Sequence, residues 1–438
     1  MKQIYEYYLL VAPFLGFSYW IVNYFFKKNK ANVILTAVIV SYIFFSTNYE
    51  NFGLSFDPYR LTHRFIGVVA ILLFGFYLLK NKNYRIISTE ITLYVFFGMA
   101  IVFSYVGNEI NINHYLHYAR NYFYVGAIAL LFCYMIDSLE KLNEVFVFYI
   151  NSLIILSPGI LLGLSSIGWH RESLFFSNPN YLAYIFLPAI AYLLFSKIKY
   201  KSIIFLIFSL SIFTTGSRSA VAALILIIFV YLIYKFNIRI TLKIILTYIL
   251  ILFCLFIFLT QISIKTISGT YRVLDNTINF SRIVSSLLAA NMFIENPING
   301  IGYGQFRTKF HLYMTEDIRN LNNSEFNEAS LSWDPELDDK FFIDKQGRNV
   351  EKMTHNDFVS IIAETGIIGL IFLFIYFYIV LKKVKEIMIK NREIYFMSIC
   401  LILPTVLFSF FHNNMNSFMF WLILYIPIIF HRILYEKK

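Results

Sequence analysis

Residues 358–385 read FVSIIAETGIIGLIFLFIYFYIVLKKVK, an apolar run of 24 residues that ends in a cluster of lysines. A helix of this length crosses the roughly 30 Å hydrocarbon layer of a membrane. Lysines directly after such a run are suited to the water interface beyond it. The alternation of apolar runs and short basic clusters repeats along most of the chain. It predicts an all-α polytopic membrane protein.

The composition agrees with this fold class. Of 438 residues, 58% are hydrophobic and 14% are charged, and the mean hydropathy is +0.64, which excludes a water-soluble globular domain. A β-barrel is excluded because barrel strands alternate in polarity and run only about ten residues. The excess of basic over acidic residues, 37 against 26, is interpreted as a topology signal, so no nucleic-acid partner is expected.

The apolar runs predict about 12–13 transmembrane helices. Candidate spans lie at roughly 8–26, 31–47, 63–80, 90–107, 120–136, 145–165, 180–196, 201–215, 218–235, 242–262, 358–381, 394–411 and 416–431. Basic clusters occupy every second connection, which the positive-inside rule assigns to the cytoplasm. Three regions follow: transmembrane helices about 1–10 over 1–262, an extracytoplasmic loop over 263–355 that carries part of the active site, and the C-terminal helices over 356–438.

Arginine is concentrated on the predicted outer side. The cytoplasmic connections hold 17 Lys and 4 Arg, whereas the outer side holds 6 Lys and 10 Arg. A guanidinium near the interface offers a planar fork for phosphate or carboxylate oxygens. Snorkelling to lipid headgroups explains any single case, but as a set they indicate function. Five of them lie in short outer connections or first helical turns: Arg60, Arg64, Arg120, Arg171 and Arg218.

The strongest local motif is Thr214-Thr215-Gly216-Ser217-Arg218-Ser219-Ala220, a tight outer turn between two apolar runs. We expect Ser217 to cap the following helix, whose first amides and positive dipole end then face the same space as Arg218. This combination suits an anion, particularly a diphosphate. A capped helix start with a snorkelling arginine is the simpler alternative. A similar start at Asn178-Pro179-Asn180 makes Asn180 and the preceding Arg171 candidate site-lining groups.

The predicted outer loop holds two further features. An amphipathic stretch from Phe280-Ser281-Arg282 to Phe293 leads into Glu295-Asn296-Pro297 and a glycine-rich segment, Gly300 to Gly304. The glycines are not a nucleotide-binding loop, because no strand precedes them and no GK[ST] follows; we expect a turn that lets the backbone pass close to the membrane surface. The acidic stretch from Asp334 to Asp344 offers ligands for a divalent cation, although solvated loop carboxylates are the simpler interpretation.

The stretch from Met353 to Phe358 places His355 and Asn356 at the outer mouth of a span. An imidazole there is able to take a proton from a sugar hydroxyl, and an interfacial or capping histidine is the alternative. Glu364 lies about two turns into the apolar run, where the bilayer penalises a charge unless it faces a cavity or a partner.

Together these residues resemble the bacterial O-antigen ligase and Wzy-type polysaccharide polymerase superfamily. The resemblance covers roughly residues 170–430 and rests on the order of the motifs on either side of one long outer loop. The matching segments are Thr215 to Ser219, Arg282 through Glu295-Asn296-Pro297 to Phe306, His355-Asn356 through Glu364-Thr365-Gly366 to Gly369, and the helix start at Asn178-Pro179-Asn180.

The resemblance implies a GT-C-type glycosyltransferase of the bacterial cytoplasmic (inner) membrane with its active site on the extracytoplasmic face. It would transfer a glycan from undecaprenyl diphosphate to an acceptor sugar hydroxyl, with inversion and without a metal or cofactor. In that family the arginines matching Arg218 and Arg282 hold the diphosphate, and the histidine matching His355 acts on the acceptor. Arg120 and Arg171 are further diphosphate candidates by position. The implied partners are the lipid-linked donor, an acceptor glycolipid, membrane lipid and a chain-length regulator.

Four functions remain open at the level of sequence. A polymerase passes the glycan to another lipid-linked repeat unit, and a ligase passes it to lipid A core or another terminal acceptor. We favour the polymerase. A lipid-linked oligosaccharide transporter is a third candidate. It does not require a long outer loop bearing a base, so the predicted loop weighs against it. A metal-dependent GT-C mannosyltransferase would carry essential carboxylates in the first outer loop, where Glu50 and Asp57 are available.

Overall fold

The computed structural model describes most of the predicted spans. The described residues are 2–27, 33–44, 72, 88–109, 112–167, 179–238, 263–266, 269–272, 276–315, 317–318, 341–343, 349–351, 356–412 and 417–435. Two predicted spans, 63–80 apart from Leu72, and 242–262, lie outside them.

Eleven described helices coincide with predicted spans. They are α1 (Lys2–Lys27), α2 (Val33–Phe44), α4 (Ser88–Phe103), α5 (Ile112–Met135), α6 (Leu139–Ile167), α7 (Pro179–Phe195), α8 (Lys201–Thr214), α9 (Arg218–Lys235), α14 (Asp357–Lys390), α15 (Arg392–Ser409) and α16 (Phe418–Tyr435). The ends differ most where a helix continues past its apolar run. Helix α14 continues beyond 381 because Val384 and Ile387 remain buried between the exposed lysines.

The fold class, an all-α polytopic membrane protein, is confirmed. By length and composition, four described helices can each cross a membrane: Leu139–Ile160, Arg218–Lys235, Asp357–Lys390 and Arg392–Ser409. Shorter apolar helices accompany them, among them Val33–Phe44, Pro179–Phe195 and Lys201–Thr214. The total of 12–13 spans stays a prediction, since it includes residues outside the described part of the chain.

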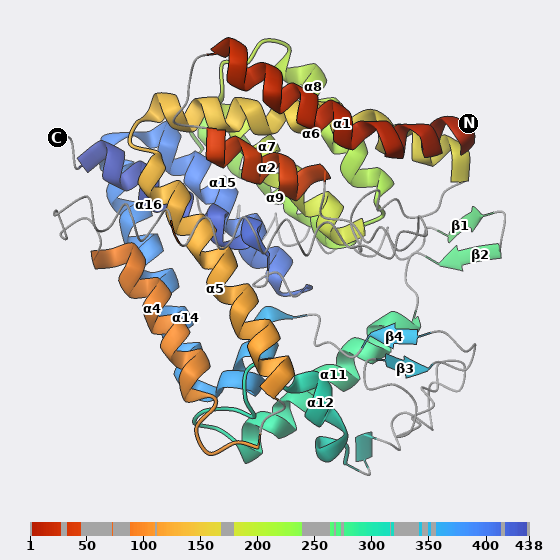
Figure 1. Cartoon of the computed structure of the whole chain (residues 1–438), viewed down its shortest axis with the longest axis vertical. Helices are drawn as coiled ribbons and strands as arrows, with labels where there is room; N and C mark the ends of the chain where they lie inside the picture. The colour runs from red at the N-terminus through yellow and green to blue at the C-terminus, as the bar shows by residue number, and fades with distance from the viewer. Residues whose placement is uncertain are drawn as a thin grey trace.

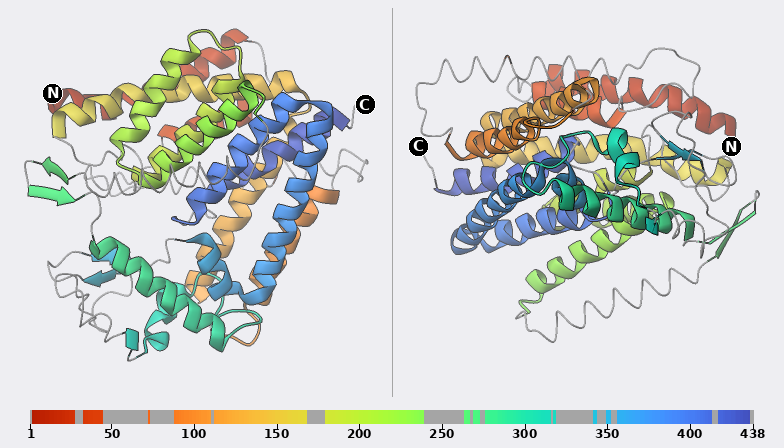
Figure 2. Two further views of the ribbon diagram at one scale, coloured as in Figure 1. Left: turned by 180° about the vertical axis from the view of Figure 1, so that it is seen from behind. Right: turned by 90° about the horizontal axis from the view of Figure 1, so that it is seen from below.

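Helices far apart in the sequence pack side by side. Helix α9 packs on α15, α1 on α6, α5 on α16, and α14 on both α4 and α16. Figure 1 shows α4, α5 and α14 extending together toward the loop helices, and Figure 2 shows α9 beside α15 from behind. Because lipid tails are as apolar as the side chains, such contacts depend on close packing and interhelical hydrogen bonds rather than on the hydrophobic effect.

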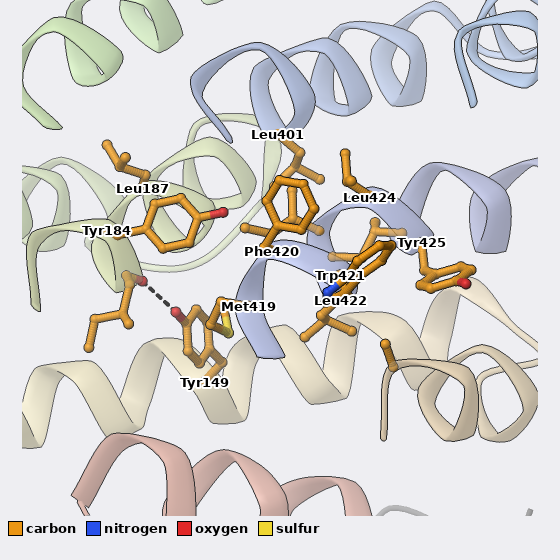
Figure 3. Close-up of a cluster of buried hydrophobic side chains, with 14 of the residues drawn as sticks. Tyr149, Tyr184, Leu187, Leu401, Met419, Phe420, Trp421, Leu422, Leu424 and Tyr425 are labelled. Atoms are coloured by element: carbon orange, nitrogen blue, oxygen red, sulfur yellow. Dashed lines mark hydrogen bonds between the residues drawn. The ribbon is translucent and has the colours of Figure 1, made fainter. Parts of the chain in front are cut away.

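The indole of Trp421 in α16 lies at the centre of this packing and is 1% exposed. Its ring centroid is 5.7 Å from that of Phe97 in α4, 5.4 Å from that of Tyr122 in α5 and 5.8 Å from that of Tyr376 in α14. The contacts with the two tyrosines are edge-to-face, the arrangement that aromatic quadrupoles favour. Figure 3 shows Trp421 between Phe420, Leu422 and Tyr425 of the same helix.

Two tyrosines on neighbouring helices extend this aromatic core. Tyr149 of α6 donates a hydrogen bond to the Ile185 carbonyl of α7, which Figure 3 marks with a dashed line. The Tyr184 hydroxyl of α7 donates to Thr405 Oγ1 of α15 over 3.2 Å. Each phenol therefore joins two helices through a polar contact inside the bundle.

Basic connections that the sequence assigns to one side meet at one end of the bundle. Arg432 Nη2, in the last turn of α16, donates to the Ile136 carbonyl beyond α5 over 2.7 Å. His431 Nε2 lies 2.5 Å from Glu386 Oε2 of α14. The Arg392 guanidinium at the start of α15 lies 5.7 Å from the Tyr234 ring near the end of α9. The alternating topology explains this gathering; that this end faces the cytoplasm stays a prediction.

The predicted outer loop begins with two short strands, β1 (Ser263–Thr266) and β2 (Gly269–Arg272), paired antiparallel with Ser263 opposite Arg272. Helix α11 (Asn276–Glu295) follows and contains the predicted amphipathic stretch. After a glycine-rich turn come α12 (Phe306–Lys309) and a 3-10 helix (Phe310–Tyr313). A second antiparallel pair, β3 (Phe341–Ile343) and β4 (Asn349–Glu351), lies near its end. These small ladders add to an otherwise helical fold.

Candidate active site

The turn between α8 and α9 is held by a chain of hydrogen bonds. Gly216 adopts a φ of 62°, which reverses the chain between the two helices. Thr215 Oγ1 donates to the Ile212 carbonyl over 2.7 Å and accepts from the Ser217 amide over 3.2 Å. Thr215 and Ser217 are fully buried, so the turn is part of the packed protein. Arg218 is therefore carried on a rigid helix start.

The prediction that the Ser217 side chain caps α9 is wrong. Ser217 occupies the N-cap position with extended backbone, but its hydroxyl makes no capping bond to the helix. Instead, Ser217 Oγ lies 3.3 Å from Ser219 Oγ. The pairing of the two hydroxyls draws the Ser217 side chain away from the first-turn amides.

His412, beyond the end of α15, is a site residue that sequence reasoning missed. Its Nε2 lies 2.7 Å from Ser219 Oγ, and the two side chains belong to residues that are 5% and 9% exposed. The imidazole also packs against Phe408, with ring centroids 4.4 Å apart and the ring planes tilted by 34°. The available signal was a histidine at the outer end of a predicted span, followed directly by Asn413 and Asn414.

Aromatic contacts bring four helix ends together around this turn. Phe408 of α15 stacks on Tyr184 of α7 at 4.7 Å, one turn from Asn180 at the start of that helix. Phe358, in the first turn of α14, lies 4.5 Å from Phe410. Since α9 packs on α15, the ends of α7, α9, α14 and α15 that the sequence predicts to be outer form one region, which we call the outer cluster.

The glycine-rich turn after α11 is seated in a kink of α14. The kink lies at Gly366, whose φ of 62° and ψ of −158° are not helical. On one side of it, the Ile301 amide donates to the Ala363 carbonyl over 3.0 Å, and the Gly302 amide donates to the Glu364 carbonyl over 3.1 Å. On the other side, the Ile367 amide donates to the Pro297 carbonyl over 2.9 Å. Amides and carbonyls that the kink releases from the helix are thus paired with the turn.

This docking explains Glu364 inside the apolar run. Glu364 is 8% exposed, and its Oε1 accepts a hydrogen bond from the Phe306 amide over 3.1 Å. Phe306 begins α12, so the carboxylate lies at the amino end of that short helix. The sequence predicted that a charge here needs a partner, and the loop supplies it.

The end of α4 holds the same turn from the opposite side. Asn108 Nδ2 donates to the Gly300 carbonyl over 2.8 Å and to the Ser104 carbonyl over 2.9 Å. The Tyr303 amide donates to Ser104 Oγ over 3.0 Å. The predicted turn is present, and its backbone lies close to α14 and to the end of α4; that it passes close to the membrane surface stays a prediction.

A buried carboxylate, that of Asp357, and a buried phenol, that of Tyr303, lie between the glycine-rich turn and the outer cluster. Asp357, in the first turn of α14, is 3% exposed and interacts electrostatically with both Tyr184 and Tyr303. Burial raises the pKa of the Tyr303 phenol well above its ordinary value, and the nearby Glu364 and Asp357 carboxylates raise it further. Tyr303 is therefore a neutral hydrogen-bonding group at physiological pH.

The remaining predicted site residues are placed unevenly. Asn180 is buried in the first turn of α7. Asn356 caps α14, because its Oδ1 accepts from the Phe358 and Val359 amides over 3.0 and 3.2 Å. Arg120 is half-buried in α5. His355, Arg171 and the acidic residues of the stretch from Asp334 to Asp344 lie outside the described residues, and so does the side chain of Arg282, which α11 carries.

The structure brings Ser217, Arg218, Asn180 and Asn356 to the outer cluster and leaves Arg120 on a neighbouring helix. Chemically, the cluster combines a guanidinium, a helix amino end, a buried histidine and a buried carboxylate. Among the described residues, no group of three His, Cys, Asp or Glu side chains is placed to hold a metal ion. A polytopic membrane protein with such a cluster is suited to bind an anionic group at the edge of the bilayer.

Comparison with known families indicates a class of enzyme. Residues 203–375 match the O-antigen ligase family, over α8 through most of α14. The matched segment contains Arg218, Arg282, His355 and Glu364, and it supports the resemblance to the O-antigen ligase/polymerase superfamily. The match supports a membrane enzyme that processes glycans in the O-antigen pathway. Comparison with curated protein sequences gives no match.

Proposed function

We propose that the chain is a polysaccharide polymerase that transfers a glycan from undecaprenyl diphosphate to a sugar hydroxyl on a lipid-linked repeat unit. The observation that carries the proposal is the convergence of four helix ends around Arg218, with the α9 amino end in the same place. An anionic diphosphate at the bilayer edge is the part of such a donor that this arrangement suits.

The reaction requires the protein to stabilise the leaving diphosphate and to accept the proton of the acceptor hydroxyl. The bond between the anomeric carbon and the phosphate oxygen breaks, and the diphosphate leaves with its electron pair. Arg218 and the α9 amino end stabilise the growing negative charge, and Arg282 is the second proposed diphosphate ligand. Arg120 and Arg171 are proposed further ligands of the same group.

His355 is the proposed base. It takes the proton of the acceptor hydroxyl as the new carbon–oxygen bond forms. One such displacement at the anomeric carbon inverts its configuration, and the proposed mechanism uses neither a metal nor a cofactor. The Asn356 cap fixes the start of α14, and so it sets the point at which the chain segment carrying His355 leaves the helix.

The proposal places this chemistry on the extracytoplasmic face of the bacterial cytoplasmic membrane. The positive-inside pattern supports it, since the outer cluster lies at the opposite ends of these helices from the basic connections. The proposed partners are the lipid-linked donor, an acceptor glycolipid, membrane lipid and a chain-length regulator.

A ligase is the second candidate, because the family that residues 203–375 match is that of O-antigen ligases. In that case the same donor is used, and the acceptor is lipid A core or another terminal glycolipid. The proposed donor site is the same for both functions, so the identity of the acceptor distinguishes them.

The test is reconstitution of the purified protein with an undecaprenyl-diphosphate oligosaccharide, with and without lipid A core. A ladder of products from the donor alone indicates a polymerase, and a single transfer that requires lipid A core indicates a ligase. Arg218→Lys should lose most activity, because lysine lacks the planar fork. Arg392→Lys is the matched control, since Arg392 lies at the opposite end of the bundle. Equal activity of the two variants would refute diphosphate binding by Arg218.

A further inference from the structure

The contact between Ser219 and His412 joins two helices at the outer cluster. Ser219 lies in the first turn of α9, directly after Arg218, and His412 follows α15. Their polar atoms are 2.7 Å apart in a buried setting. A hydrogen bond of this length in a low-dielectric interior is a strong constraint on both side chains.

Ser219 differs from other buried serines of the bundle in where its hydrogen bond goes. The hydroxyls of Ser152, Ser157 and Ser398 each donate to the carbonyl four residues earlier in their own helix, over 2.7–3.0 Å. That partner is not offered to Ser219, because the residue four positions earlier, Thr215, precedes the helix. A serine in a first turn must find its partner elsewhere, and here it is His412.

The imidazole is itself held in place by its surroundings. It packs at a tilt against Phe408. Phe408 stacks on Tyr184, whose hydroxyl donates a hydrogen bond to Thr405 of the same helix as Phe408. Packing from α7 and α15 therefore orients the ring so that Nε2 faces Ser219. Because the His412 ring is fixed, its hydrogen bond also fixes the position of the Ser219 hydroxyl.

We propose that His412 is a positioning residue of the donor site, which acts through Ser219 to hold the first turn of α9 and with it Arg218. The proposal rests on the function proposed above. Since Ser217 makes no capping bond to α9, the serine–histidine contact between helices takes over the task of fixing this helix start. It thereby sets the direction in which Arg218 and the α9 amides meet the diphosphate.

The test is direct binding of farnesyl diphosphate to the full-length protein in nanodiscs, followed by calorimetry, with farnesol as the ligand that lacks the diphosphate. His412→Ala and Ser219→Ala should each raise Kd about fivefold to tenfold, the equivalent of one ordinary hydrogen bond. The double variant should bind no more weakly than either single variant. His412→Gln, which keeps an amide near the position of Nε2, should restore Kd to within about twofold of wild type.

The matched control is His431→Ala, which removes a histidine that also makes a hydrogen bond and a ring contact, but at the opposite end of the bundle. Its Kd should equal that of wild type. Thermal unfolding of every variant separates positioning from stability, because a merely structural contact lowers the unfolding midpoint without changing Kd of the folded protein.

The outcomes are distinguishable. If His412→Ala and Ser219→Ala bind like wild type while Arg218→Ala does not, the positioning role is wrong and the donor site stands. If the wild-type protein binds farnesyl diphosphate no better than farnesol, the proposed donor is wrong and the positioning role falls with it. A Kd raised by both single variants, and restored by His412→Gln, supports the inference.

Discussion

Replacing Gly300 by alanine should detach the glycine-rich turn from the kink of α14. Gly300 has a φ of +68°, and a Cβ built on it would lie 2.4 Å from the Glu364 carbonyl carbon and 2.5 Å from the Thr365 amide nitrogen. Both are backbone atoms, so no side-chain rotation relieves the overlap. The turn must withdraw from the helix instead.

The size of the effect follows from what the withdrawal removes. The left-handed backbone of an alanine costs about 1–2 kcal/mol. Loss of the Ile301 and Gly302 hydrogen bonds to α14 adds about 1 kcal/mol each. The sum is about 3–4 kcal/mol, which changes the docking equilibrium by roughly a hundredfold or more. Gly107→Ala is the matched control, because Gly107 has a φ of +79° but open space where a Cβ would lie.

Hydrogen–deuterium exchange of peptides covering 296–306 and 361–370 measures this docking. In Gly300→Ala the amides of Ile301, Gly302 and Ile367 should exchange roughly a hundredfold faster than in wild type, and transfer activity should fall. Gly107→Ala should show no more than about a thirtyfold change, since only the backbone cost of about 1–2 kcal/mol applies. Equal exchange rates in the two variants would refute the docking model.

Three further predictions concern the same region. Glu364→Leu leaves the Phe306 amide without its acceptor and should speed exchange at 301–306 about tenfold, whereas Glu364→Gln keeps a carbonyl oxygen and should stay near wild type. Docking of the glycine-rich turn should weaken as pH rises above about 10, because the Tyr303 phenol ionises at its ordinary pKa when the turn is undocked, whereas its pKa is raised when the turn is docked. Tyr303→Phe should remove this part of the pH dependence of hydrogen exchange. An unchanged pH profile in this variant would contradict the prediction. His355→Ala should abolish transfer yet bind farnesyl diphosphate like wild type, and loss of binding would make it a structural residue.

The sequence predicted the membrane helices well because their signal is local. A run of about 20 apolar residues has few alternatives to a spanning helix, whatever it packs against. Helix ends were less certain, since α14 continues beyond 381 where only Val384 and Ile387, on one face of the helix, remain buried. The cap at Ser217 was predicted from residue type and position, but a competing hydroxyl two residues later changed its partner.

Residue chemistry alone determined that this is a polytopic membrane protein and that Glu364 needs a partner, and it predicts that arginines gather on one side. Only the tertiary structure decided which partners meet. Phe306 is 58 residues from Glu364, and Ser219 is 193 residues from His412. Neither pair leaves a periodic or spacing signal, because the contacts depend on how separate helices pack and on the kink at Gly366. The packing of helices therefore determined which residues meet in the outer cluster, whereas hydropathy determined where the membrane helices lie along the sequence.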